Sequence, residues 1–324
     1  MKAPAFWYRQ KSVWALLLKP ISFIYAWSVA RRFQKTTPYQ SDVPVICVGN
    51  LTVGGTGKTP VCLTIGDFLK KKGIRFFYLN HGYKAKEKNI LVNLEKQSAL
   101  DIGDEAVLLA LNAPTVVDNK RARGAQKAVK NGAKAIIMDD GFQNPSLVKS
   151  FSFVVVDGQK GFGNELVLPA GPLREPVATG LKRADAIVVA GEDTWGVDFY
   201  LKRHQIDLPV LTGHFLLNPE IVKALRGRDV FAFAGIGMPE KFFAALQNEG
   251  INVKGAQSFP DHYLYTNFDM DEIIRKAGSL PVLTTTKDAV KLSAHMRKKV
   301  VVVDGQFVFD KPDQLEQVLK GVFE

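Results

Sequence analysis

Short apolar runs alternate with longer segments of helical periodicity from residue 43 onward. Short runs bounded by turn-forming residues are typical of buried strands, and apolar residues at every third or fourth position are typical of amphipathic helices. The predicted strands are 44–48, 75–79, 115–117, 135–138, 153–156 and 186–189, and the predicted helices include 58–71, 104–110 and 120–131. This alternation predicts an α/β fold with a doubly wound, mostly parallel sheet, which binds ligands at the carboxyl ends of its strands.

The alternation is interrupted over residues 190–215, which end in a segment that is predicted to be an extended connection, 208–214. A second series then begins, with strands predicted at 229–234, 252–259, 281–285 and 300–303 and a helix around 241–250. Chains of this length commonly form two domains. We expect a first domain over residues 33–205 and a second, smaller α/β domain over residues 206–324, which closes a cleft between the two.

The segment before residue 33 is apolar and rich in aromatic residues, and basic residues flank it. Lys19-Pro20 divides the segment, which disfavours a signal peptide and a membrane span and predicts two short helices. Aromatic side chains placed among lysines and arginines are typical of segments that lie in a membrane interface. We expect residues 1–32 to form an amphipathic, membrane-contacting segment, with an ordinary helix packed on the first domain as the alternative.

A glycine-rich turn follows the first predicted strand and reads Asn50-Leu-Thr-Val-Gly-Gly-Thr-Gly-Lys-Thr-Pro60. Between a strand and a helix N-terminus, such a turn holds nucleotide phosphates, because its N–H groups and the helix dipole favour negative charge. Lys58 can reach the β- and γ-phosphates, and the Thr59 hydroxyl can hold Mg²⁺. Thr52 stands where the strict motif has its first glycine, but the Gly54-Gly55 doublet resembles a known variant. The predicted phosphate-binding residues are Thr52, Val53, Gly54, Gly55, Thr56, Gly57, Lys58 and Thr59. The motif predicts a P-loop NTPase-type fold for the first domain.

Acidic residues occur at two positions where a phosphoryl-transfer site needs them. The strand predicted at 135–138 ends in Asp139 and Asp140, as in a Walker-B element that brings a carboxylate to Mg²⁺, although Asp-Gly is also an ordinary turn. Asp104 and Glu105 begin a predicted helix. There a carboxylate either caps the helix or accepts a proton from a substrate hydroxyl, and the residue pattern leaves both open.

His262 follows Asp261 in a loop after a predicted strand, and loops carry function more often than cores do. A single histidine is nevertheless more often structural, so the residue pattern alone does not assign it a role.

Net charge, cysteine content and missing motifs limit which partners and nucleotides the chain is expected to bind. The net charge of +11 suits either an anionic partner or a solvated basic surface. We expect no nucleic-acid partner, because no zinc knuckle or aromatic RNA motif is present. The two cysteines, Cys47 and Cys62, are too few for a disulfide framework and favour a reduced compartment. The guanine-specifying Asn-Lys-x-Asp motif is missing, which disfavours a GTPase and favours ATP as the donor.

The ordered set of motifs resembles one family. The motifs are the glycine-rich turn, His81-Gly-Tyr-Lys, Gly103-Asp-Glu, Asp139-Asp-Gly-Phe-Gln, Leu168-Pro-Ala-Gly-Pro-Leu-Arg-Glu-Pro, Phe233-Ala-Gly-Ile-Gly, Phe259-Pro-Asp-His-Tyr and Thr285-Thr-Lys-Asp. In this order they resemble the tetraacyldisaccharide 4′-kinases, the lipid A 4′-kinases of Gram-negative bacteria. The resemblance runs from the N-terminal aromatic segment to about residue 290.

The resemblance implies a reaction and a place for it. ATP would phosphorylate the 4′-hydroxyl of an acylated glucosamine disaccharide 1-phosphate to give lipid IVA, with Mg²⁺ as cofactor. The first domain would then be the P-loop nucleotide-binding kinase domain. The enzyme would be a peripheral protein on the cytoplasmic face of the inner membrane.

The resemblance also implies roles for individual residues. Asp104 would be the catalytic base with His262 as its partner, and Asp139 and Asp140 would serve the metal together with Thr59. The other candidate site residues are His81, Tyr83, Glu105, Gln143, Asn144, Arg174 and Glu175. The family usually has arginine at the position of His81, and a histidine cannot form a permanent bidentate contact with phosphate at neutral pH. The family usually has histidine at the position of Asn144, and an asparagine keeps the hydrogen bonding but cannot titrate.

Two other functions are compatible with the glycine-rich turn. A deviant P-loop ATPase would act as a switch that binds a protein partner. A P-loop kinase or ligase for a soluble small molecule would not use the amphipathic N-terminus.

Overall fold

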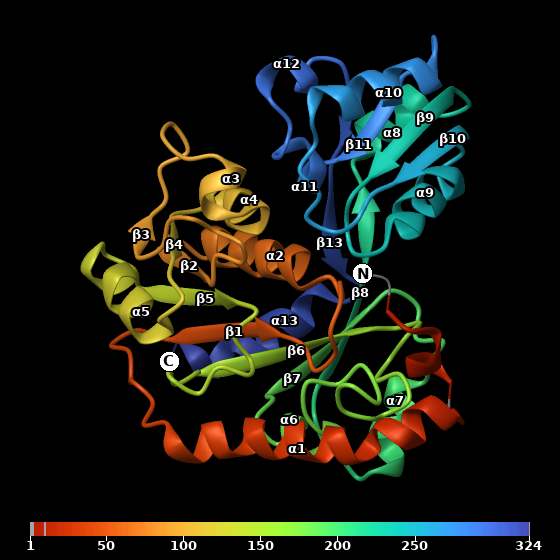
Figure 1. The fold of residues 1–324 in the computed structure, drawn as a ribbon. Coiled ribbons are helices and arrows are strands. Elements are labelled where there is room, and N and C mark those ends of the chain that lie inside the picture. Colours follow the sequence, from red (N-terminus) through yellow and green to blue (C-terminus); the bar gives the residue numbers. More distant parts are fainter. Residues whose placement is uncertain (1–2, 10, 324) are drawn as a thin grey trace.

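A nine-stranded sheet forms the centre of the larger domain of this computed structural model, which describes residues 3–9 and 11–323 (Figure 1). The strand order is β13-β8-β7-β6-β1-β5-β2-β4-β3, and all neighbours are parallel except the antiparallel pairs at the two edges. The strands are β1 (Val45–Gly49), β2 (Phe76–Asn80), β3 (Ile90–Leu91), β4 (Thr115–Val117), β5 (Ala135–Asp139), β6 (Phe151–Asp157), β7 (Ala186–Ala190), β8 (Val210–Leu217) and β13 (Gly305–Phe309). The predicted doubly wound, mostly parallel sheet is confirmed.

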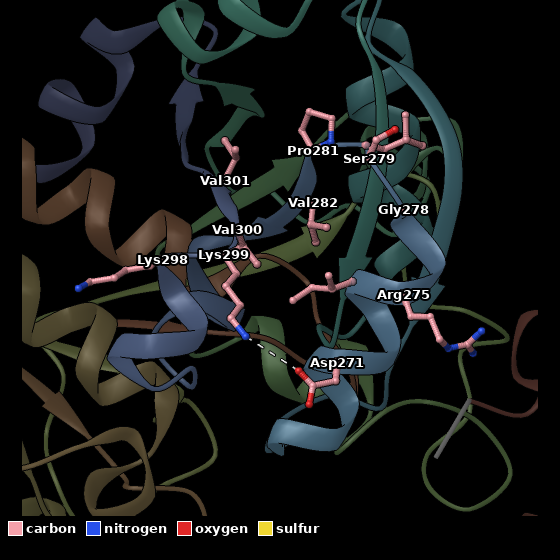
Figure 2. Close-up of a pocket in the computed structure, with 12 residues that line it drawn as sticks. Asp271, Arg275, Gly278, Ser279, Pro281, Val282, Lys298, Lys299, Val300 and Val301 are labelled. Atoms are coloured by element: carbon pink, nitrogen blue, oxygen red, sulfur yellow. Dashed lines mark ion pairs between the residues drawn. The ribbon is translucent and has the colours of Figure 1, made fainter.

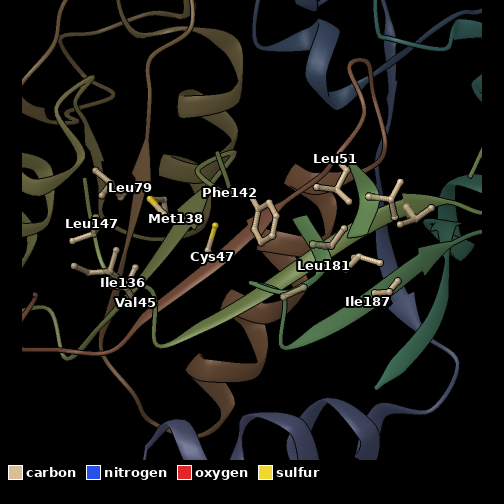
Figure 3. Packing of buried hydrophobic residues seen from close by; sticks show 14 of the residues in the cluster. Val45, Cys47, Leu51, Leu79, Ile136, Met138, Phe142, Leu147, Leu181 and Ile187 are labelled. Carbon is tan, nitrogen blue, oxygen red and sulfur yellow. The ribbon is translucent and has the colours of Figure 1, made fainter. Parts of the chain in front are cut away.

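Alternate residues of the central strand face two separate cores. Val45 and Cys47 of β1 pack in one hydrophobic cluster, whereas Ile46 and Val48 pack in the other. Figure 3 shows part of the first cluster, with Cys47 lying near Phe142. The first face is covered by α1 (Val13–Lys35), α5 (Arg121–Lys130), α6 (Val177–Leu181) and α7 (Val197–Arg203), and the second by α2 (Lys58–Lys71), α4 (Asp104–Asn112) and α13 (Pro312–Leu319). Burial on both faces explains why these strands are continuously apolar.

The N-terminal segment contains the short 3₁₀ helix η1 (Ala5–Tyr8) and a single long helix, α1. The prediction of two helices divided at Pro20 was wrong. A narrow strip of small side chains, which includes Ala15 and Ser22, docks the helix on the large domain. The Ser22 hydroxyl donates to the Val167 carbonyl oxygen and accepts from the Ala170 N–H. The buried contacts of Ala15 and Ser22, on either side of Pro20, offset the helix hydrogen bond that the proline removes and the steric clash that it introduces.

The smaller domain is an insertion between two neighbouring strands of the large sheet. The chain leaves the large sheet at the end of β8 and returns in β13, which pairs antiparallel with β8 from Gly305–Leu217 to Phe309–Gly213. The segment 208–214, which was predicted to be an extended connection, is extended, and most of it belongs to strand β8 of the large sheet. Residues 206–324 therefore contribute to both sheets, and the change of sheet does not coincide with residue 205.

Four parallel strands in the order β10-β9-β11-β12 form the second sheet. They are β9 (Asp229–Ala234), β10 (Asn252–Ser258), β11 (Val282–Thr285) and β12 (Val301–Val303). One face packs against α8 (Pro219–Leu225) and α9 (Pro239–Asn248), and the other against α10 (Asn267–Ala277) and α12 (Ala294–Arg297). The remaining helices are α3 (Ala99–Ile102), α11 (Thr286–Ala289) and η2 (Lys320–Val322). The strands predicted for this region are confirmed to within two residues at each end.

The core packing predicts the effect of truncating a central aromatic residue. Phe153 of β6 is 0% exposed, whereas Phe268 of α10 is 76% exposed. Phe153→Ala should lower the free energy of unfolding by about 3–5 kcal/mol, because it removes apolar contacts and leaves a cavity. Urea denaturation followed by circular dichroism measures this change. The control Phe268→Ala should stay within about 0.5 kcal/mol of wild type, and equal losses for the two variants would contradict the assignment of the core.

Candidate active site

The glycine-rich turn lies between the end of β1 and the start of α2, where the sequence pattern placed it. Gly54 and Gly57 have φ angles of 109° and 88°, a conformation that side chains disfavour. Gly57 is the N-cap of α2, so the positive end of the helix dipole points into the turn. The Asn50 amide donates to the buried Thr56 hydroxyl over 3.2 Å, which holds the base of the turn. This arrangement fits the phosphates of a nucleotide.

Asp139, at the end of β5, is a buried carboxylate beside the phosphate loop. Its Oδ2 accepts from the Thr59 hydroxyl over 3.3 Å and from the Asn80 amide over 3.2 Å. The side chain is almost inaccessible to water, and burial raises the pKa of Asp139 to about 7, with smaller contributions from the charges of Glu105 and Asp140. A buried carboxylate of this kind is well placed to interact with a cation brought by the nucleotide.

Asp140 is next to Asp139 but has the opposite electrostatic environment. Burial acts to raise its pKa, but the charges of Lys58 and Arg174 outweigh burial and lower it. Arg174 contacts both carboxylate oxygens at 2.9 and 3.3 Å, and Lys58 Nζ lies 3.7 Å from Oδ2. Asp140 thus positions the lysine of the phosphate loop and also connects the loop to the segment that contains Arg174.

The oxygen atoms at this position fit a magnesium ion bound together with a nucleotide. Among the described residues there is no group of three or more His, Cys, Asp or Glu that could hold a metal on its own. Mg²⁺ does not require such a group, because it commonly takes one or two carboxylates and completes its shell with water and substrate phosphates. Thr59 and Asp139 offer a hydroxyl and a carboxylate side by side, and both are hard oxygen ligands.

Asp104 and His262 meet across the two domains. Asp104 is the first residue of α4 in the large domain, and His262 lies in the loop after β10 in the small domain. His262 Nδ1 lies 2.9 Å from each carboxylate oxygen of Asp104. Burial acts to raise the pKa of Asp104, but this hydrogen bond and the charges of Lys287, His262 and Lys291 hold it at about 2. The Asp104 carboxylate is therefore ionised at neutral pH.

The phosphate loop also contacts the small domain directly. The backbone of Gly55 packs against that of Gly237, and a Cβ added to Gly237 would lie 3.2 Å from the Gly55 nitrogen and Cα atoms. The same Cβ would lie 3.5 Å from Asp261 Oδ2, one residue before His262. The phosphate loop, the Gly237 turn and the Asp104–His262 pair therefore lie together at the junction of the domains.

Comparison with known proteins identifies the family of a chain with this site. Residues 14–324 match the family model described as "Tetraacyldisaccharide-1-P 4'-kinase". The tetraacyldisaccharide 4′-kinase of Paramagnetospirillum magneticum is 44% identical over 318 residues, which are 97% of each chain. That of Rhodospirillum rubrum is 43% identical over 324 residues, which are 98% of this chain and 97% of the relative.

The chain belongs to the tetraacyldisaccharide-1-P 4′-kinase family. A solved structure, LpxK from Aquifex aeolicus in complex with ATP, superposes with a TM-score of 0.75 at 29% identity and covers 96% of this chain and 99% of its own. The resemblance drawn from the sequence motifs is therefore confirmed, as is the P-loop kinase fold.

Two predicted site residues of this family member lie near the domain junction with their side chains exposed. The Tyr83 ring is 56% exposed, and its centroid lies 5.2 Å from that of the His262 ring. His81 is also exposed to solvent. Burial, with the charges of Arg121 and Lys88, lowers the pKa of His81, so this side chain carries less positive charge at neutral pH than an arginine would.

Four other predicted residues have partners in the loops around the site. Gln143 donates to the Asn50 carbonyl oxygen over 2.8 Å and accepts from Arg174 over 3.3 Å, so it braces the phosphate loop. Asn144 accepts from the Ser146 N–H and hydroxyl, which directs its amide oxygen into a local turn. Thr52 bridges to Leu173, and the Val53 N–H donates to the Pro172 carbonyl oxygen, so these two residues attach the loop to its neighbour.

Three polar residues at the site had no predicted role. Arg121 is 1% exposed, and its guanidinium donates to the carbonyl oxygens of Asp139 and Asp140. Asn80 supports Asp139 from the end of β2, and Lys287 contacts the Asp104 region from the small domain. Asn80 could have been found because it directly follows a predicted strand, as Asp139 does. Arg121 could not, because a basic residue at the start of a helix is normally exposed.

The small domain also carries a surface hollow that is separate from this site. Asp271, Arg275, Lys298 and Lys299 line it, and an ion pair of 3.9 Å joins Lys299 to Asp271 (Figure 2). It lies at the amino ends of β11 and β12, whereas Lys287 and the site follow the carboxyl end of β11. Ligands of open parallel sheets bind at the carboxyl ends of the strands. The nucleotide is therefore expected on the side of the phosphate loop and not in this hollow.

The structure predicts that Glu175 stabilises the folded protein through its ion pair with Arg183. Its buried carboxylate accepts two contacts of 2.7 Å from Arg183, so Glu175→Gln should lower the free energy of unfolding by about 2 kcal/mol. The loss is below that of a fully buried pair because Arg183 remains partly exposed. Urea denaturation measures it. As a control, Glu316→Gln breaks the exposed pair with Lys72 and should change stability by less than about 0.5 kcal/mol; equal effects would contradict this role.

Proposed function

We propose that this protein transfers the γ-phosphate of ATP to the 4′-hydroxyl of tetraacyldisaccharide 1-phosphate and produces lipid IVA. Membership in the family supports the activity and the lipid disaccharide as its substrate. The observation that carries the proposal in this chain is the Asp104–His262 pair at the junction where the small domain meets the phosphate loop. A sugar hydroxyl that enters this junction can meet both a proton acceptor and the donor phosphate.

In the proposed mechanism, Asp104 orients the sugar hydroxyl and takes its proton. A carboxylate with a pKa of about 2 is a weak base, but it is fully ionised and fixed by His262. Phosphoryl transfer has a loose transition state in which positioning and charge stabilisation contribute most, so a weak, well-oriented acceptor is sufficient. His262 holds the carboxylate and does not itself need to exchange a proton.

The phosphate loop holds the donor in this mechanism. The N–H groups of residues 54–59 and the end of α2 surround the phosphates, and Lys58 offsets the negative charge that develops on the transferred group. Thr59 and Asp139 would hold Mg²⁺, which when bound neutralises charge on the phosphate oxygens. Asp140 and Arg174 keep Lys58 in position.

We also propose that the protein lies on the cytoplasmic face of the inner membrane through α1. By length and composition, α1 could cross a membrane, but it lies along the large domain (Figure 1). Its outward face exposes large apolar side chains, among them Trp14 at 67%, Phe23 at 75% and Trp27 at 60%. Such a face, with Lys19 and Arg31 among the exposed residues, suits insertion at the level of anionic headgroups. An acylated substrate would be reached at the same surface.

The assignment of Asp104 is tested by removing its charge. Asp104→Asn should lower kcat by at least about 100-fold and leave KM for ATP nearly unchanged, because the phosphate loop is intact. The assay is the formation of bisphosphorylated lipid from ATP, Mg²⁺ and the tetraacyl disaccharide 1-phosphate in detergent micelles. The control Asp101→Asn changes a partly buried carboxylate that caps the neighbouring helix α3, keeps an oxygen that can accept from Ser98, and should stay within twofold of wild type. Activity of Asp104→Asn within a few-fold of wild type would exclude Asp104 as the acceptor.

The membrane assignment is tested on the exposed face of α1. The double variant Trp14→Ser/Phe23→Ser should reduce binding to phosphatidylglycerol-containing liposomes by about tenfold or more, since two large apolar side chains no longer insert. Co-sedimentation measures the bound fraction. Phe268→Ser, on the small domain, removes an equally exposed aromatic ring and should leave binding unchanged. Unchanged binding of the double variant would mean that α1 only packs against the fold.

A further inference from the structure

Lys287 makes more contacts across the domain junction than the mechanism above requires. It lies in α11, within the Thr285-Thr-Lys-Asp288 motif. Its Nζ is 3.2 Å from Asp261 Oδ1, 3.5 Å from Glu105 Oε1 and 4.0 Å from Asp104 Oδ2. Asp261 belongs to the small domain, whereas Asp104 and Glu105 begin α4 of the large domain. One ammonium group therefore joins carboxylates from both domains.

The neighbour of Lys287 fixes α11 within the small domain. Asp288 is fully buried and accepts from the Gly235 N–H, the Tyr265 hydroxyl and the Thr285 hydroxyl at 3.0, 2.8 and 2.7 Å. It also pairs with the buried Lys291 at 2.6 Å. A buried, fully bonded network of this kind is rigid.

The partners of Asp288 connect α11 to the other parts of the site. Gly235 begins the turn that brings Gly237 against Gly55 of the phosphate loop. Tyr265 closes the loop that carries His262. Lys287, His262 and Gly237 are therefore held on one hydrogen-bonded framework in the small domain.

We propose that Lys287 is a positioning residue that couples docking of the small domain to the orientation of Asp104. The inference rests on the proposed function, because it assigns Lys287 a role only through Asp104. When the small domain docks, the ammonium group draws Asp104 and Glu105 toward Asp261, and the Asp104 carboxylate faces His262. When the small domain is apart, Asp104 lacks both of these partners.

The charges at the junction explain why a cation is needed there. Without Lys287, docking would bring Asp261 close to Asp104 and Glu105, and like charges in a partly buried site oppose approach. Burial acts to lower the pKa of Lys287, but the charges of Glu105, Asp104 and Asp261 outweigh it and raise the pKa, so the amine remains charged at neutral pH.

The activity test uses the full-length protein in the micelle assay. Lys287→Met should lower kcat by about 10- to 100-fold with little change in KM for ATP, because a small misplacement of the acceptor is costly and the phosphate loop is untouched. Lys287→Arg keeps the charge and should recover part of the loss. The control Lys276→Met removes the same charge from an exposed pair with Glu272 on α10 and should retain kcat within twofold.

The pH dependence of kcat supplies a readout that a purely structural role would not move. The groups that face Asp104 are His262, Lys287 and Lys291 from the small domain, with Glu105 beside it on α4. Loss of the Lys287 charge removes a cation that favours the carboxylate, so the acid limb of the profile should move to higher pH in Lys287→Met and return in Lys287→Arg. An unmoved acid limb in Lys287→Met would contradict the proposal.

Domain docking is measured independently of catalysis. Spin labels at Glu95→Cys on the large domain and Ala256→Cys on β10 report the distance between the domains, and the natural Cys47 and Cys62 are buried. Lys287→Met should broaden this distance distribution, whereas Lys276→Met should not. An unchanged distribution, or wild-type kcat in Lys287→Met, would overturn the proposal. Absence of product from the wild type would instead contradict the proposed function, and the distance measurement would still test Lys287.

Discussion

The hydrogen bond between Asp104 and His262 is the interaction on which the site depends, because its two partners belong to different domains. Asp104 starts a helix of the large domain, and His262 follows the edge strand of the small sheet. The pair forms only when the inserted domain sits over the carboxyl ends of the large sheet. The paired strands β8 and β13 lead into and out of that domain, so they set where His262 can reach.

Burial and ion pairing shift the pKa values of the acidic site residues in different directions. Asp139 is enclosed by β5 and the phosphate loop, and burial raises its pKa despite the opposing charge of Lys58. Asp140 and Asp104 face basic groups, and their pKa values are lowered. Three carboxylates within one site therefore suit three tasks: holding a cation, positioning Lys58 and accepting a proton. The carboxylates are chemically similar, and their surroundings create the differences between them.

The helix α1 combines an exposed apolar face with a contact to the residues that support the phosphate loop. Its most buried residues, Ala15 and Ser22, have small side chains, which brings this part of its backbone close to the large domain. The wide remaining face is apolar and exposed. Arg32, near the end of this helix, donates to the Gln143 carbonyl oxygen, and Gln143 braces the phosphate loop. The helix that we propose to contact lipid is thus in direct contact with the frame of the nucleotide site.

The sequence by itself determined the elements and residues whose chemistry is local. The strands at 115–117 and 229–234 and the helix at 58–71 were predicted at their observed bounds, because continuous or periodic burial leaves a pattern in neighbouring residues. The phosphate loop was visible for the same reason, since glycines, lysine and threonine act there through adjacent backbone. Where burial varies along a strand, as in β8 next to the edge strand β13, the sequence pattern indicated only an extended connection. Only the tertiary structure decided that α1 is one helix, that Glu175 pairs with Arg183, and that Lys287 reaches Asp104. These outcomes depend on which surfaces dock. Lys287 and Asp104 are more than a hundred positions apart, so no local periodicity could reveal their contact.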